Sequence, residues 1–198
     1  MLFVVTGPSG GGKSTLIHHA VKDLRNVRFS VSHTTRPRRL SEQEGKDYYF
    51  IGRPEFERMI ARKQFVEWAV VHGQYYGTSR KEIREKGESG DLILDIDVQG
   101  ARQIKASRLP AVFVFIFPPK YSELRKRLAH RGEDKPEAIE RRLKNAKREI
   151  RHYGDFDYVV VNNKLDRAVL ELESVILSSR CRTEARKAEL QPILKSFA

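Results

Sequence analysis

The sequence predicts an α/β fold in which helices flank a parallel sheet of five strands. Two observations lead to this prediction. Short runs of apolar and β-branched residues alternate along the chain with segments whose apolar residues recur at helical spacing. The runs are apolar almost throughout, as expected of strands that helices cover on both faces.

Four runs are strong strand candidates, and a weaker fifth, at 29–32, completes the predicted sheet. The strong runs are residues 2–6, 92–96, 112–117 and 158–161. Helical spacing of apolar residues predicts helices between and after them, at 13–24, 122–131, 136–151 and 165–177.

The segment 34–89 breaks this alternation, because it is rich in Arg, Tyr and Gly. It contains one helix candidate at 54–62 and a capping-box pattern, Ser79 to Glu82, that opens another. We interpret 34–89 as an insertion that carries specificity, and 1–33 with 90–198 as the core. The last ~20 residues are predicted to form a solvated basic helix and tail.

Composition limits the classes of partner. The 198 residues suit a single domain, and 38 Lys and Arg against 26 Asp and Glu give a net charge of +12. A nucleotide, a nucleic acid or a membrane surface is therefore the expected kind of partner. One cysteine excludes a disulfide framework and a cysteine-based zinc site. The sequence has no apolar run of membrane-spanning length and no recognisable signal peptide, so we expect a cytoplasmic protein.

A phosphate-binding motif joins the first strand candidate to the first helix. Residues 7–14, Gly-Pro-Ser-Gly-Gly-Gly-Lys-Ser, match GxxxxGK[ST]. Glycines let backbone N–H groups converge on phosphate oxygens, and the helix N-terminus adds a favourable dipole. Lys13 can reach the transferred phosphate, and the Ser14 hydroxyl can bind Mg²⁺. The motif predicts a P-loop NTPase-type core that binds ATP.

The strand candidate at 92–96 ends with two aspartates, one inside it and one directly after it. Asp95 and Asp97 lie two residues apart, so in a strand they would point to one face, at the sheet edge where ligands bind. One could hold Mg²⁺ through water while the other contacts substrate. The alternative is an ordinary turn or helix-capping aspartate.

Six motifs together resemble the guanylate kinase family. They are GPSGGGKST, FSVSHTTRPRR, GKDYYF, FVEWA, GQYYGTS and LDIDVQG, in the family's order and approximate spacing, over Phe3 to about Asn163. The resemblance implies ATP and Mg²⁺ as cofactors and phosphorylation of GMP and dGMP to the diphosphates. It also implies that 34–89 is a GMP-binding subdomain and that about 120–151 forms a helical lid.

The resemblance also assigns roles to single residues. The implied guanine readers are Ser32, Glu67, Thr78 and Asp97. The implied clamp on the GMP phosphate is Arg36, Arg39, Tyr48 and Tyr76, with Gly77 close to the nucleotide. The implied ATP contacts are Gly7, Pro8, Ser9, Gly10, Gly11, Gly12, Lys13, Ser14 and Thr15, with Asn162 and Asn163 near adenine. The implied catalytic groups are Lys13, Arg131 and Arg142.

Other interpretations stay open at this point. Because Pro37 is shifted relative to the family pattern, Arg38 competes with Arg39 for the clamp. Arg125, Lys126, Arg127 and Lys147 are expected to be solvated. A scaffold domain that binds proteins, another small-molecule kinase and an RNA-binding protein are the alternative functions. We expect small-molecule substrates without nucleic acid or membrane partners, and a monomer or small homo-oligomer.

Overall fold

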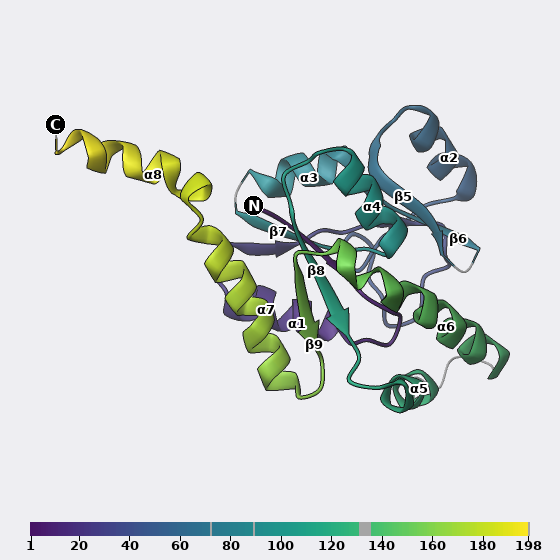
Figure 1. Ribbon diagram of the computed structural model, residues 1–198. Helices are drawn as coiled ribbons and strands as arrows, with labels where there is room; N and C mark the ends of the chain where they lie inside the picture. The colour runs from purple at the N-terminus through teal and green to yellow at the C-terminus, as the bar shows by residue number, and fades with distance from the viewer. Residues whose placement is uncertain (72, 89, 131–135, 198) are drawn as a thin grey trace.

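The computed structural model describes residues 1–71, 73–88, 90–130 and 136–197 (Figure 1). Its centre is a five-stranded sheet in the order β2-β7-β1-β8-β9, in which every pairing is parallel. The strands are β1 (Leu2–Thr6), β2 (Val27–Phe29), β7 (Asp91–Asp95), β8 (Val112–Phe117) and β9 (Tyr158–Val161). The predicted fold class is confirmed.

Helices cover both faces of this sheet, which explains why its strands are continuously apolar. On one face, Phe3 and Val5 of β1 pack in a core with α1 (Lys13–Asp23) and α7 (Leu165–Arg180). On the other face, Val4 packs in a second core with residues of α4 (Val98–Ala106). Alternate residues of one strand therefore serve the two cores.

A second sheet lies beside the first, in the order β4-β3-β6-β5. Its strands are β3 (His33–Thr34), β4 (Tyr49–Phe50), β5 (Phe65–Val71) and β6 (Gln74–Ser79), and its helices are α2 (Arg53–Ala61) and α3 (Arg80–Gly87). Phe56 is fully buried and stacks on Phe65 and Tyr75, with ring centroids 4.4 and 5.1 Å away. This aromatic cluster gives the inserted segment a core of its own.

The chain after β8 forms two helices, α5 (Tyr121–His130) and α6 (Pro136–Glu149), and then the 3₁₀ helix η1 (Ile150–Asp155). A small apolar cluster of Leu124, Leu128, Leu143 and Ala146 holds α5 against α6. The last helix, α8 (Thr183–Lys195), extends away from the body (Figure 1) and buries none of its residues. Of the helices in the described ranges, none is both long and apolar enough to cross a membrane.

Two local predictions need correction. The fifth strand is not at 29–32, because β2 spans Val27–Phe29. The N–H of Ser30 still donates to Ile93 O at 2.9 Å, and the chain then leaves for the second sheet. The Ser79 side chain caps α3 as expected, but the Glu82 carboxylate accepts the N–H of Val31 at 2.7 Å, a distant residue.

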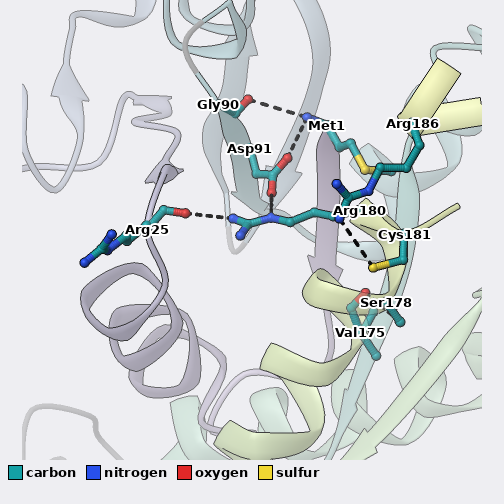
Figure 2. A network of polar contacts seen from close by, with 9 residues as sticks. All are labelled: Met1, Arg25, Gly90, Asp91, Val175, Ser178, Arg180, Cys181 and Arg186. Carbon is teal, nitrogen blue, oxygen red and sulfur yellow. Dashed lines mark hydrogen bonds and ion pairs between the residues drawn. The ribbon is translucent and has the colours of Figure 1, made fainter. Parts of the chain in front are cut away.

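A polar network closes the amino-terminal edge of the central sheet (Figure 2). Asp91, the first residue of β7, accepts the amino group of Met1 at 2.8 Å and Nε of Arg180 at 2.7 Å. Arg180 also donates to the carbonyl of Arg25 at 2.8 Å. The last turn of α7 is thereby tied to the start of β7 and to the end of the α1 segment.

Candidate active site

The loop between β1 and α1 has the backbone of a phosphate cradle. Gly10 and Gly12 have φ of 84° and 89°, which side chains rarely adopt. A Cβ on Gly12 would also lie 2.2 Å from Nδ2 of Asn162. The N–H of Gly11 donates to Pro8 O at 2.9 Å, and α1 begins at Lys13. The remaining N–H groups of the loop and of the first helical turn surround a site for anionic oxygens.

Lys13, Ser14 and Asp95 meet beside this loop. Nζ of Lys13 donates to Gly7 O at 2.8 Å and lies 3.8 Å from Oδ1 of Asp95. The Ser14 hydroxyl donates to Oδ2 of Asp95 at 3.1 Å. Hydroxyl and carboxylate oxygens are the donors that Mg²⁺ prefers, so the pair fits that ion. Among the described residues, no group of three or more His, Cys, Asp or Glu is placed to hold a metal.

Asp97 has the capping role that sequence analysis left open. It is the N-cap of α4, where Oδ1 accepts the N–H of Gly100 at 2.9 Å and Oδ2 accepts Nε2 of Gln99 at 2.9 Å. Its half-buried side chain still borders the same cleft as Lys13. Capping and contact with a ligand are thus compatible for Asp97, whereas Asp95 faces the P-loop side chains.

Glu67 is a buried carboxylate with a neutral partner. It is 3% exposed, and Oε1 accepts the hydroxyl of Thr78 at 2.6 Å. The Ser32 hydroxyl lies 3.3 Å from that of Thr78. Burial raises the pKa of Glu67 to about 7; the hydrogen bond from Thr78 opposes this rise, and the charge of Asp97 adds to it. The structure therefore brings together all four residues implied as guanine readers.

The implied phosphate clamp is also assembled. Cζ of Arg36 lies 5.5 Å from the ring centroid of Tyr48, and the rings of Tyr48 and Tyr76 are 5.9 Å apart. Burial raises the pKa of the Tyr48 phenol, so it is a neutral donor. Glu42, which sequence analysis missed, accepts Nη2 of Arg36 at 2.6 Å and the backbone N–H of Arg39 at 2.8 Å. It holds this loop in place.

One cleft of about 980 Å³ connects the P-loop with the inserted subdomain. The predicted residues that line it are Gly7, Ser9, Gly10, Gly12, Lys13, Ser14, Thr15, Ser32, Arg36, Arg39, Tyr48, Glu67, Tyr76, Asp97 and Arg142. Arg39, not Arg38, is among its lining residues. Gly77 is not among the lining residues, and a Cβ there would lie 3.0 Å from Glu67 O and from the rings of Phe56 and Phe65. Arg131 lies outside the described residues.

Asn162 contacts the P-loop rather than open space. Its Nδ2 donates to Gly11 O at 2.8 Å, and its side chain is buried, whereas Asn163 is exposed. The guanidinium of Arg127 donates to Asn162 O at 3.1 Å and to Gly11 O at 3.4 Å. The expectation that Arg127 is solvated is therefore wrong, because α5 places it against the loop.

Glu149 is a second residue that sequence analysis missed. It lines the cleft with Arg142, two helical turns earlier on α6, and that spacing was a signal available in the sequence. Burial raises the pKa of Glu149, Lys13 opposes this rise, and Asp97 adds to it. The carboxyl-terminal end of α6 therefore brings the Glu149 carboxylate close to Lys13 of the P-loop.

The first strand of the parallel sheet leads into a phosphate-binding loop, and the second sheet with its clustered Arg and Tyr lies across the cleft. This arrangement defines a P-loop phosphotransferase that acts on nucleotides. Comparison with known proteins specifies the class further. The guanylate kinase family model matches residues 1–179, and the chain belongs to that family.

Individual relatives agree with this membership. The guanylate kinase of Dechloromonas aromatica is 47% identical over 188 residues, covering 94% of this chain and 93% of that protein. That of Geobacter metallireducens is 48% identical over 184 residues, covering 92% and 91%. The crystal structure of guanylate kinase from Anaplasma phagocytophilum superposes with a TM-score of 0.74 at 33% identity, covering 92% of this chain and 87% of that one.

Proposed function

We propose that this chain transfers the γ-phosphoryl group of ATP to the phosphate of GMP, and of dGMP, giving ADP and the diphosphate. The observation that carries the proposal is one cleft lined by both the P-loop and Glu67, whose buried carboxylate accepts the hydroxyl of Thr78. Family membership supports it. The proposed setting is the cytoplasm, with a monomer or small homo-oligomer as the working form.

Catalysis in this cleft rests on positioning and charge. The acceptor is a phosphate oxygen that is already ionised near neutral pH, so no side chain has to create the nucleophile. Lys13, anchored by Gly7 O, neutralises the transferred group, and Arg142 adds positive charge from α6. Closure of the subdomain and the lid excludes water, which would otherwise accept the phosphoryl group.

The proposed cofactor is ATP with Mg²⁺. Ser14 would bind the ion directly, and Asp95 would hold it through water, since the two side chains already meet at 3.1 Å. When bound, the ion supplies positive charge to the phosphate oxygens. Asn162 supports the loop that carries the nucleotide, through its bond to Gly11 O.

GMP recognition uses the opposite side of the cleft. Arg36 and Arg39 suit bidentate contacts with the phosphate, beside the phenols of Tyr48 and Tyr76. Guanine presents N1–H and N2–H₂ donors, which an ionised Glu67 can accept. Adenine has an acceptor at N1 and no N2 amine, so it would leave a buried carboxylate unpaired, at a cost of several kcal/mol.

A coupled ADP-release assay with ATP, Mg²⁺ and a panel of nucleoside monophosphates tests the proposal. GMP should be the preferred acceptor, with a kcat/KM well above those of AMP, CMP and UMP. ADP release that is independent of any monophosphate, or an equal response to all four, would contradict a GMP kinase.

Glu67→Gln tests the proposed base reader. The substitution keeps the size of the side chain but replaces one acceptor oxygen with a donor that faces a guanine donor. Charged hydrogen bonds contribute roughly 1.5–3 kcal/mol, so kcat/KM for GMP should fall about tenfold to over a hundredfold. AMP offers an acceptor at N1, so its kcat/KM should rise while that for GMP falls. The ratio of kcat/KM for GMP over AMP should therefore decrease. An unchanged ratio would show that Glu67 does not read the base.

A further inference from the structure

The helix α4 presents a face to the buried carboxylate of Glu67. Gly100 lies on that face, and a Cβ at this position would stand 2.4 Å from Oε2 and 3.1 Å from Cδ of Glu67. The other carboxylate oxygen is held by Thr78 at 2.6 Å. Glu67 therefore occupies the volume that any side chain at position 100 would need.

One turn further along α4, Gln103 holds the backbone next to Glu67. Its Nε2 donates to Trp68 O at 2.6 Å, and its Oε1 accepts the N–H of Trp68 at 3.2 Å. β5 is the edge strand of its sheet, and its register against β6 shifts between Phe65 and Glu67. A side-chain amide thus replaces a neighbouring strand at the irregular part of β5, where a strand is otherwise poorly fixed.

We propose that Gly100 and Gln103 are positioning residues for Glu67, and that they set the choice between guanine and adenine without touching the nucleotide. The proposal rests on the function proposed above. Gly100 provides the space for the carboxylate, and Gln103 fixes the strand that carries it. The same turn of α4 holds Asp97, whose Oδ1 accepts the N–H of Gly100, so two implied base readers are set by one helix.

The chemistry of Gly100 makes the idea testable without unfolding the protein. Alanine is a better helix former than glycine, and Gly100 is not in a left-handed conformation. The nearest atoms to the added Cβ belong to the end of a flexible side chain rather than to backbone. Gly100→Ala should therefore displace the carboxylate of Glu67 while α4 stays intact.

The experiment measures kcat/KM for GMP and AMP, the KM for ATP and the thermal midpoint in Gly100→Ala and Gln103→Ala. Gly87→Ala on α3 is the matched control, because nothing lies within 4 Å of the added Cβ. We expect the GMP/AMP ratio to fall about tenfold or more in Gly100→Ala, since a charged hydrogen bond is misplaced. The KM for ATP should not change, and the midpoint should not fall. Gln103→Ala should lower the ratio less, and the control should leave it unchanged.

A double-mutant cycle completes the test. If Gly100→Ala acts by moving Glu67, it should lower the ratio little further in a Glu67→Gln background. An unchanged ratio in Gly100→Ala, a proportional loss with both acceptors, or full additivity with Glu67→Gln would overturn the proposal. A wild-type protein that does not prefer GMP would instead overturn the proposed function, so the two failures are distinguishable.

Discussion

Strand β7 carries an aspartate at each end, and the two side chains have different partners. Asp91, at the amino end, has a side chain only 9% exposed, and its two oxygens lie 2.8 Å from the Met1 amino group and 2.7 Å from Nε of Arg180 (Figure 2). Asp95, at the carboxyl end, is 18% exposed and lies 3.1 Å from the Ser14 hydroxyl and 3.8 Å from Nζ of Lys13.

The difference follows from the edge of the sheet at which each aspartate lies. At the carboxyl edge of a parallel sheet, loops leave room for ligands, and a carboxylate there needs partners that can rearrange when a nucleotide binds. At the amino edge of this sheet, Asp91 joins segments that are distant in the sequence, through close contacts with charged groups. We infer that one residue type serves function at one end of β7 and stability at the other.

The largest expected effect is at the carboxyl edge. Lys13→Ala removes the charge next to the transferred group, and loss of such a contact costs about 3 kcal/mol or more, over a hundredfold in kcat. The free energy of unfolding should change little, because the Lys13 side chain lines the cleft and is not part of an apolar core. Steady-state kinetics and chemical denaturation measure the two quantities. A folded variant with near-full activity would contradict the proposed kinase mechanism.

Asp91→Asn should show the reverse pattern. It leaves the guanidinium of Arg180 without its carboxylate, and breaking such a pair costs about 2 kcal/mol of unfolding free energy, less than a fully buried pair because Arg180 is 28% exposed. The kcat/KM for GMP should stay near the wild-type value at a temperature where the variant is folded. A large loss of activity without a loss of stability would contradict the inference that Asp91 serves stability rather than function.

The same contrast, between a residue at the cleft and a similar residue away from it, is found in the loop that carries Arg38 and Arg39. Both Arg38 and Arg39 are exposed, but Arg39 lines the cleft and Arg38 does not. Arg39→Ala should raise the KM for GMP at least about tenfold, as expected for a lost charged contact, and leave the KM for ATP nearly unchanged. Arg38→Ala is the matched control and should change both constants much less. A selective effect from Arg38 would show that the shifted Pro37 misaligned the motif.

Sequence patterns predict the elements of this protein well where the determinants are local. β8 and β9 begin and end at the predicted residues, because their apolar and β-branched runs are sharply bounded. The P-loop is likewise a contiguous motif. The guanine readers came from family resemblance, since Ser32, Glu67 and Asp97 lie far apart in the chain.

The misses share one cause, which is contact between distant segments. The capping-box pattern correctly predicts that the Ser79 hydroxyl accepts the N–H of Glu82. It does not predict that the Glu82 carboxylate accepts the N–H of Val31, because Val31 is distant in the sequence. The charged residues around Arg127 predict a solvated side chain, and only the packing of α5 brings it to Gly11. The positions of Gly100 and Gln103 on α4 predict a helix face, but not that β5 lies against it.

The smallest expected effect concerns a third kind of carboxylate. Asp91 and Asp95 each have a cation nearby, whereas Glu67 has the neutral hydroxyl of Thr78. Burial raises the pKa of Glu67 to about 7, with Asp97 adding to the rise and Thr78 opposing it. Because the raised value favours the neutral form, the ionised fraction in the substrate-free protein grows as pH increases through 7.

Guanine needs the ionised form, so kcat/KM for GMP should fall as pH is lowered through this range. The phosphate of the substrate also titrates, but AMP carries the same phosphate, so the GMP/AMP ratio isolates the base. From the ionised fractions, that ratio should fall about fourfold between about pH 8 and pH 6.5. In Glu67→Gln, which cannot titrate there, the ratio should be independent of pH. A flat ratio in the wild type would mean that the carboxylate is already ionised throughout, and that Thr78 and the cleft stabilise its charge more than burial penalises it.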